Sequence, residues 1–241
     1  MKQKRICLWS SPRNISTALM YSFAQRSDTR VIDEPLYAHY LHITNADHPG
    51  REEVIENMER DGEKVIREVV LSDYEEEVIF IKQMTHHLIE LDESFLEKVT
   101  NVFLIRNPKQ LISSLSQVLP EVGMRDTGIA RQHQLFRQIH SKGDRPIVID
   151  SGEILKEPEI ALNKLCRELE IPFDKSMLQW EAGPLKEDGV WAKYWYENVH
   201  RSTGFEKQVT SSRELREDLY PLYEECLEYY NEMYEYSIKA L

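Results

Sequence analysis

Two short segments of the sequence combine arginine with hydroxyl side chains at points where a strand gives way to a helix. One is the turn Ser10-Ser11-Pro12-Arg13-Asn14-Ile15-Ser16-Thr17, and the other is Arg106-Asn107-Pro108 followed by a stretch that carries Ser114. Guanidinium and hydroxyl donors, with the free N–H groups of a helix N-terminus, are suited to binding a tetrahedral anion. Two such segments predict a ligand with a phosphate at each end. The candidate ligand-binding residues are Arg13, Asn14, Ser16, Thr17, Arg106 and Ser114.

Each segment also has a purely structural explanation. Serine and threonine are common helix caps, and Arg106 could pair with a surface carboxylate, which is worth about 1 kcal/mol or less. The first turn contains no glycine, the nearest being Gly50, and the sequence has no GxxxxGK[ST] motif. A nucleoside-triphosphate loop with its lysine and magnesium-binding hydroxyl is therefore a poor fit.

Short apolar runs alternate with amphipathic stretches along most of the chain. Runs rich in β-branched residues are typical of strands covered on both faces, and alternation with helices predicts a parallel sheet. We therefore expect a three-layer α/β fold, with helices on both faces of a parallel sheet, in a single domain over residues 1–241. The predicted strands are 5–9, 30–33, 77–82, 101–105 and 146–150, and the predicted helices are 16–25, 52–70, 109–118, 129–140 and 158–169.

The last 70 or so residues contain no convincing strand and end in a helical pattern of apolar residues at three- and four-residue steps. Ser211 and Glu214 form a candidate capping box at its start. Pro221 is expected to restart or kink this helix, because proline cannot donate a backbone hydrogen bond.

Composition limits the classes of function. The 241 residues include 30 Lys and Arg against 42 Asp and Glu, for a net charge of −12. This balance argues against nucleic acid and anionic membranes as partners, since both select basic surfaces. The three cysteines form no CxxC pair, and no apolar run suits a signal peptide or a membrane span. We expect a cytoplasmic protein, and the sequence does not indicate its oligomeric state.

The two arginine segments resemble motifs of the sulfotransferases that use 3′-phosphoadenosine 5′-phosphosulfate (PAPS). SSPRNIST is similar to their 5′-phosphosulfate loop, LIRNPKQLISSLS to their 3′-phosphate motif, and VIDSGEILKEPEIALNKLCRELEIPFD to the strand, turn and helix that follow. The resemblance covers residues 5 to about 175. It is greatest to bacterial sulfotransferase-like proteins and to a plant version fused to an aminotransferase-like domain.

The resemblance implies a P-loop-type fold and metal-free, in-line transfer of a sulfonate from PAPS, as co-substrate, to a small hydroxyl or amino acceptor. Arg13 would stabilise the leaving 5′-phosphate, with Ser16 and Thr17 on its oxygens. Arg106 and Ser114 would bind the 3′-phosphate.

Two candidates exist for the base that accepts the proton of the acceptor. Family spacing assigns the role to Glu34, whereas the ordinary pKa of histidine favours His86 or His87, which resemble the histidine after a strand in cytosolic members. Lys82 is a candidate contact of the sulfonate, or else a surface cation beside the acidic run 73–77. Regular strand alternation would point Asp33 away from Glu34, in a structural role.

Several other residues are weaker candidates. The aromatic cluster 191–196 could stack on adenine, form a wall of the acceptor pocket or simply pack. Ser202 and Thr203 are polar enough to reach the co-substrate. His39, His42 and His48 lack a zinc motif, so no metal site is expected.

Two other functions remain open. Ile15 stands at a family glycine position and the C-terminal Arg-Lys-Gly loop is missing, which favours a non-catalytic nucleotide-binding or partner-docking module. A small-molecule kinase is the other alternative.

Overall fold

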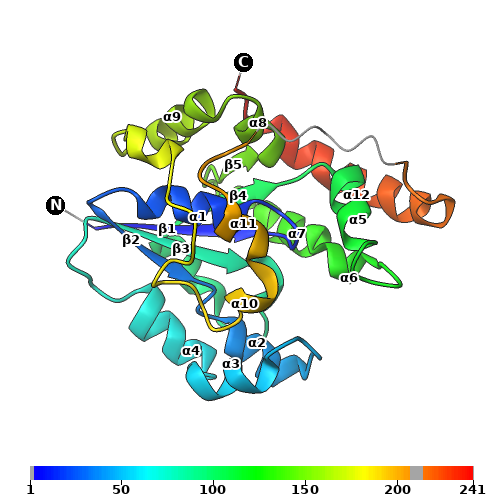
Figure 1. Ribbon diagram of the computed structural model, residues 1–241, viewed down its shortest axis with the longest axis horizontal. Coiled ribbons are helices and arrows are strands. Elements are labelled where there is room, and N and C mark those ends of the chain that lie inside the picture. The colour runs from blue at the N-terminus through cyan, green and yellow to red at the C-terminus, as the bar shows by residue number, and fades with distance from the viewer. Residues whose placement is uncertain (1–2, 207–213, 241) are drawn as a thin grey trace. The chain divides into compact units, whose positions relative to one another are not determined.

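The computed structural model describes residues 3–206 and 214–240 (Figure 1). Its six strands form one sheet in the order β2-β3-β1-β4-β5-β6. The β2–β3, β4–β5 and β5–β6 pairs are parallel, and helices flank the sheet. The predicted α/β fold class is therefore confirmed. The strands are β1 (Lys4–Ser10), β2 (Thr29–Asp33), β3 (Val78–Met84), β4 (Thr100–Ile105), β5 (Ile147–Asp150) and β6 (Ser237–Ile238).

The described residues group into two compact units. The first unit comprises residues 3–8, 16–101 and 174–204. Its core includes the stacked rings of Phe23 and Phe80, whose centroids are 4.0 Å apart, and the buried Ile6 and Leu8 of β1. Its helices are α1 (Ser16–Ala24), α2 (Tyr37–Thr44), α3 (Arg51–Asn57), α4 (Gly62–Val65), α10 (Ala192–Trp195) and α11 (Glu197–Arg201).

The second unit comprises residues 9–15, 102–173, 205–206 and 214–240. The buried rings of Phe103 on β4 and Phe136 on α7 pack edge to face, with centroids 5.9 Å apart. The prediction of one domain over residues 1–241 stays a prediction. The helices of this unit are α5 (Pro108–Leu115), α6 (Met124–Thr127), α7 (Ile129–Ser141), α8 (Ser151–Lys156), α9 (Pro158–Glu168) and α12 (Tyr220–Glu235).

Two of the predicted elements need correction. The helix predicted over 52–70 is interrupted: α3 ends at Asn57, and Asp61 begins α4 by accepting a hydrogen bond from the N–H of Lys64 at 3.1 Å. The C-terminal segment does contain a strand, since Ser237 and Ile238 pair in parallel with Val148 and Ile149. A two-residue strand is too short to produce a recognisable sequence pattern.

The last helix starts later than the predicted cap. The helix α12 begins at Tyr220 with Pro221 in its first turn, where a missing N–H costs nothing. Pro221 thus lies at the start of α12, and the predicted restart or kink of a longer helix stays a prediction, because the predicted capping residue Ser211 lies outside the described residues.

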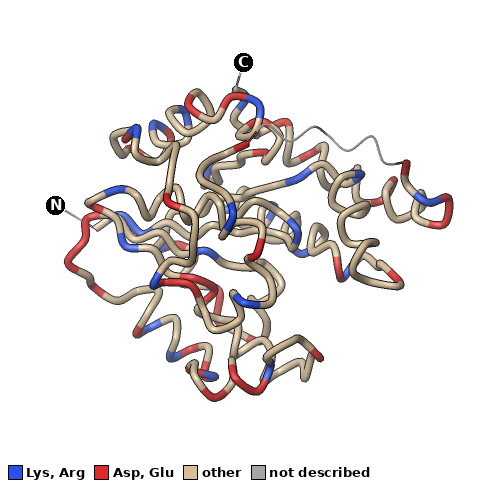
Figure 2. The backbone as a smooth tube through the Cα atoms, in the orientation of Figure 1, with Lys and Arg blue, Asp and Glu red and all other residues tan. Residues whose placement is uncertain are grey.

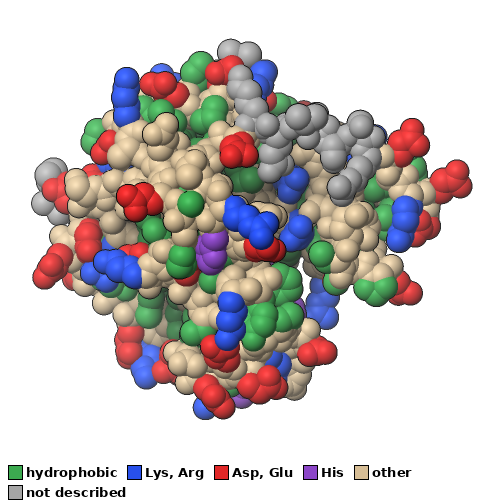
Figure 3. All heavy atoms as spheres, viewed as in Figure 1, with side chains coloured by type: hydrophobic (Ala, Val, Ile, Leu, Met, Phe, Trp, Pro, Cys, Tyr) green, Lys and Arg blue, Asp and Glu red, His purple; other side chains and the backbone are tan. Residues whose placement is uncertain are grey.

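Charged side chains are dispersed along the described chain. Figure 2 shows acidic and basic residues scattered along the backbone, and the face seen in Figure 3 carries both signs among hydrophobic side chains. Among the described residues, no helix is long and apolar enough to cross a membrane.

Candidate functional site

The turn after β1 is held in a specific shape by side chains of the second unit. The backbone of Arg13 adopts a left-handed conformation with φ of 56°. The amide of Asn14 donates to the carbonyl of Leu104 at 3.0 Å and accepts from the N–H of Ile15 at 2.9 Å. The turn is therefore attached to the end of β4, and an unusual backbone conformation for a non-glycine residue is maintained there.

A buried glutamine that sequence analysis missed supports the same turn. The Nε2 atom of Gln132, on α7, donates to the carbonyls of Trp9 and Leu104, at 2.9 Å each. Its side chain thus joins the ends of β1 and β4. Gly128, which precedes α7 with φ of 66°, lies so close that an added Cβ would be 3.3 Å from Pro12. No sequence motif marks Gln132, because its role depends on two carbonyls far away in the chain.

The two predicted phosphate segments converge within the second unit. The Nε atom of Arg13 donates to the hydroxyl of Ser114 at 3.0 Å, and Nη1 of Arg106 donates to the carbonyl oxygen of Arg13. The side chain of Asn107 caps α5 by accepting from the N–H of Lys109 at 3.0 Å. The sequence predicted one arginine at each end of a ligand, whereas the structure links Arg13 directly to the Arg106–Ser114 segment.

The electrostatics of this cluster favour an anion. Burial lowers the pKa of Arg106, the positive charge of Arg13 lowers it further, and Asp150 acts in the opposite direction. Arg106 remains protonated at neutral pH because an arginine pKa starts above 12. Two guanidinium groups that repel each other would both be stabilised by an oxyanion between them.

In the first unit, Glu34 lies at the sharp turn that ends β2. Its φ of 38° is left-handed, and its N–H donates to the carbonyl of Lys82 at 2.9 Å. The side chains of Asp33 and Glu34 both contact Lys82. The expectation that Asp33 points away from Glu34 is therefore wrong. Alternation of side chains applies only while a strand continues, and the chain leaves the strand geometry at Glu34.

Lys82 is the centre of a buried polar network. Its Nζ atom donates to Asp33 Oδ1 at 2.9 Å, to Glu34 Oε1, and to the hydroxyl of Tyr196 at 2.6 Å. The hydroxyl of Tyr196 donates to Asp33 Oδ2 at 2.8 Å and accepts from the indole of Trp191 at 3.1 Å. Lys82 has 0% exposure, so the alternative of a surface cation beside residues 73–77 is wrong.

The pKa shifts in this network have identifiable causes. Burial raises the pKa of the Glu34 carboxyl, and the opposing charge of Lys82 only partly reverses this effect. Burial acts to lower the pKa of Lys82, but the carboxylates of Asp33 and Glu34 outweigh it and hold that pKa well above its usual value. Lys82 is therefore a permanent cation at neutral pH, and Glu34 is a more basic carboxylate than an exposed one.

The two histidines after β3 differ in environment. His87 is buried between Tyr37 and Tyr40, with ring centroids 4.9 and 4.7 Å away. Burial, followed by the charge of His86, holds the pKa of His87 well below its usual value. Its Nδ1 lies 3.9 Å from Glu34 Oε2, too far for a hydrogen bond. His86 is half-buried and packs edge-on against Tyr40.

The remaining candidates also lie in the first unit. Ser16 is buried and Thr17 is half-buried at the start of α1. The hydroxyl of Ser202 accepts from the indole of Trp180 at 3.1 Å, and the carbonyl of Thr203 accepts from its backbone N–H at 3.0 Å. Both positions thus anchor Trp180, and a role for them in binding the co-substrate stays a prediction.

The aromatic cluster 191–196 divides between packing and the polar network. Trp191 and Tyr196 are buried in a core with Tyr37 and Tyr40, whereas Tyr194 and Trp195 are exposed. The contact of Tyr196 with Lys82 could not be predicted, because nothing in the sequence connects the two residues. His39 contacts the backbone carbonyls of Arg60 and Ile89.

Comparison with known proteins agrees with these features. A family model described as "Sulfotransferase domain" matches residues 4–236. Branched-chain-amino-acid aminotransferase-like proteins 2 and 1 of Arabidopsis thaliana are 40% and 42% identical over 224 residues. The match covers 92% of this chain, which spans only 40% of the length of either plant protein. The predicted likeness to a plant aminotransferase-like protein is confirmed.

Two solved structures share the fold. The sulfotransferase domain from the curacin biosynthetic pathway has a TM-score of 0.65 at 17% identity, covering 95% of this chain and 98% of that one. The sulfotransferase domain from the Synechococcus PCC 7002 olefin synthase has a TM-score of 0.60 at 16% identity, covering 96% of both chains. The match of the family model over nearly the whole sequence shows that this chain belongs to the sulfotransferase domain family.

Proposed function

We propose that this protein transfers a sulfonate from PAPS to a small acceptor that carries a hydroxyl or amino group. The observation that carries the proposal is the cluster of Arg13, Arg106 and Ser114, which places two guanidinium groups and a hydroxyl together after β1 and β4. Ligands of parallel α/β sheets bind at the carboxyl ends of the strands, and a doubly phosphorylated co-substrate matches two cations there.

We assign the binding of the co-substrate to the two arginine segments. Arg13 would stabilise the charge that builds on the leaving 5′-phosphate, and the hydroxyls of Ser16 and Thr17 would donate to its oxygens. Arg106 and Ser114 would bind the 3′-phosphate, with Asn14 holding the turn in shape. Ser202 and Thr203 are retained as weaker candidates for the co-substrate site.

We assign the general base to Glu34. Its raised pKa makes it a stronger proton acceptor than an exposed glutamate. The alternative base, His86, lies after β3 in the same unit, and His87 is disfavoured because its lowered pKa weakens it as a base. Lys82 would keep Glu34 ionised and positioned before the reaction. In-line transfer to the acceptor then needs no metal ion in this scheme.

One observation favours a non-catalytic alternative. Ile15 stands in the turn where related loops have glycine, and its side chain crowds the backbone that a phosphate would approach. A protein that binds the nucleotide without transferring sulfonate would keep the arginine cluster and lose turnover.

Calorimetric titration with adenosine 3′,5′-bisphosphate, combined with turnover of PAPS against a panel of phenols and amines, tests the proposal. We expect the wild-type protein to bind the bisphosphate, and Glu34→Gln to bind it equally while turnover falls about 100- to 10,000-fold, the usual contribution of a general base. Absence of binding at millimolar bisphosphate would refute the proposal. Binding without turnover for any acceptor would favour the non-catalytic alternative.

If Glu34→Gln retains near-wild-type turnover while His86→Asn is inactive with unchanged affinity for the bisphosphate, the base is His86.

A further inference from the structure

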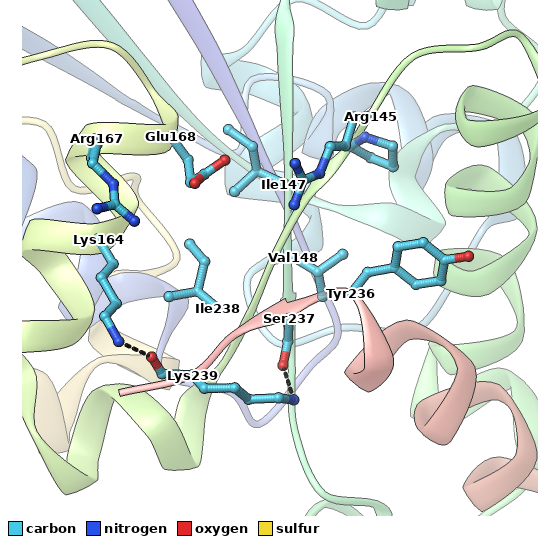
Figure 4. Close-up of a pocket in the computed structure, with 11 residues that line it drawn as sticks. Arg145, Ile147, Val148, Lys164, Arg167, Glu168, Tyr236, Ser237, Ile238 and Lys239 are labelled. Atoms are coloured by element: carbon cyan, nitrogen blue, oxygen red, sulfur yellow. Dashed lines mark hydrogen bonds between the residues drawn. The ribbon is translucent and has the colours of Figure 1, made fainter. Parts of the chain in front are cut away.

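A pocket lies in the second unit, beside the last two strands of the sheet. It has a volume of about 260 Å³ and is formed by the segment before β5, by α9 and by the C-terminal strand β6 (Figure 4). Three stretches that are far apart in the sequence therefore meet there. The residues that line it include Arg145, Ile147, Lys164, Arg167, Glu168 and Ile238.

The pocket is distinct from the arginine cluster described above. Arg106 follows the last residue of β4, whereas Ile147, in the pocket, pairs with Val102 near the first residues of β4. Adjacent residues of a strand are about 3.3 Å apart. The two groups of basic residues thus lie toward opposite ends of the same parallel strands.

The lining is strongly cationic although the protein as a whole is acidic. Two arginines and two lysines face a single carboxylate, that of Glu168, in a chain whose net charge is −12. Lys164 donates to the carbonyls of Lys239 and Ala240 at 2.8 and 3.4 Å, and Lys239 donates to the hydroxyl of Ser237 at 2.6 Å. The partners of Lys164 are neutral, whereas Lys239 also donates to the carbonyl of Tyr234, lies over the ring of Tyr234 and interacts with the charges of Glu153 and Asp150. The charge that remains for a ligand therefore comes mainly from the two arginines and Lys164.

The two arginines are uncommitted. Within residues 3–206 and 214–240, neither Arg145 nor Arg167 has a side-chain hydrogen bond or ion pair, although other arginines of the same unit are paired with carboxylates. Figure 4 shows Arg145 and Arg167 on opposite sides of the pocket, with Glu168 between them. Guanidinium groups bind phosphate and carboxylate oxygens with paired hydrogen bonds.

The floor of the pocket is apolar. Ile147 of β5 and Ile238 of β6 point to the same face of the paired strands, and Tyr236, which is 44% exposed, lies at one side. A pocket with an apolar floor and a few polar groups at its rim is typical of sites for small organic molecules. The combination favours a molecule that has both an anionic group and an apolar part.

We propose that this pocket binds a small molecule that carries a phosphate monoester. The dianion would lie between Arg145 and Arg167, where it would displace the exposed side chain of Glu168, and the apolar part of the molecule would rest on Ile147 and Ile238. A tetrahedral dianion has enough acceptor oxygens to engage both guanidinium groups at once. This site is separate from the proposed co-substrate site and does not depend on sulfonate transfer.

Calorimetric titration with phenyl phosphate tests the proposal. The titration is made in a phosphate-free buffer with adenosine 3′,5′-bisphosphate at saturation, so that the co-substrate site is blocked. We expect the double variant Arg145→Gln/Arg167→Gln to bind phenyl phosphate about 100-fold more weakly than wild type, at about tenfold for each charge-assisted contact. The matched control is Arg216→Gln, which removes an arginine paired locally with Asp218 and should bind as wild type does.

Three comparisons give decisive outcomes. If phenyl phosphate binds more tightly than phenol and more tightly than inorganic phosphate, the pocket recognises the dianion and the apolar part of the ligand together. Equal binding of inorganic phosphate and phenyl phosphate would overturn the part of the proposal that concerns the apolar floor. Equal affinity in the double variant and wild type, or no heat at millimolar ligand, would overturn the proposal.

Binding that is lost in Arg106→Ala but kept in the double variant would place the ligand at the co-substrate site instead, and would also overturn the proposal. Circular dichroism of each variant confirms that the fold is retained.

Discussion

Replacement of Lys82 by methionine tests the buried network most directly. At 2.9 Å from Asp33 Oδ1, the ammonium group is attracted by about 6 kcal/mol at an effective dielectric constant of about 20. Desolvation offsets part of this attraction. Removing one partner of a buried ion pair nevertheless costs about 3–5 kcal/mol, because the other charges remain buried without compensation. Lys82→Met should therefore lower the free energy of unfolding by about 3–5 kcal/mol at neutral pH.

The destabilisation should depend on pH. Burial already raises the pKa of Glu34 in the folded state, so its stabilising contribution is present below its unfolded pKa and is lost as the pH rises through the folded pKa. Without Lys82 that folded pKa rises further, and the loss grows as the pH rises above the unfolded pKa of glutamate, about 4.3. The raised pKa of Lys82 itself contributes no slope in this range, because its stabilising effect is complete below its unfolded pKa of about 10.4.

Urea denaturation at several pH values measures this effect. The matched control is Lys64→Met, which removes an exposed ion pair with Glu59 at 2.7 Å and should leave the free energy of unfolding almost unchanged. Adding Asp33→Asn and Glu34→Gln to Lys82→Met should recover much of the lost stability, since the uncompensated charges disappear. An equal loss in the Lys82 and Lys64 variants, or a loss that does not change with pH, would refute the reasoning.

Three further outcomes follow from the contacts. Arg106→Ala should weaken binding of adenosine 3′,5′-bisphosphate by about 1.5–3 kcal/mol. An equal loss for a ligand without the 3′-phosphate would contradict the assignment of Arg106 to the 3′-phosphate, and calorimetry measures the binding of both ligands. Tyr196→Phe removes a hydroxyl that lowers the pKa of Glu34. The acid limb of the profile of kcat/KM against pH should therefore move to higher pH. If the limb does not move, Glu34 is not the base that titrates. Tyr230→Phe deletes a 3.1 Å hydrogen bond to the buried Asp150, and thermal unfolding should show a loss of about 1–2 kcal/mol that a surface tyrosine such as Tyr220→Phe does not produce.

Most of the sheet could be predicted from sequence because its strands are local features. The five predicted strands contain runs of apolar, β-branched residues that need no information from the rest of the chain. The sixth strand could not be predicted, since Ser237 and Ile238 form a strand only by pairing with β5. The break after Asn57 was also missed, because the charged stretch continues across it with a helical composition.

The residues of the candidate site that directly follow strands could be predicted from the sequence. The contacts that bring distant residues together could not. Arg13 and Arg106 each lie just after an apolar run, so position alone marked them. The network of Lys82 was not predictable, because Asp33 lies 49 residues from Lys82 and Tyr196 lies 114 residues from it. A charged residue at the end of a strand has no local signal that distinguishes a buried cation from a surface one.

The hydrogen bonds of Arg13 and Arg106 bear on which ligands the proposed co-substrate site would accept. In the free protein Ser114 and the carbonyl of Arg13 already serve as acceptors for the two guanidinium groups. An incoming molecule must replace neutral acceptors, so it gains affinity only if its own oxygens carry charge. A neutral nucleoside would exchange one neutral contact for another and gain nothing. If the proposed co-substrate binds here, the turn would select for the charge of its phosphates and would discriminate against dephosphorylated relatives without any steric barrier.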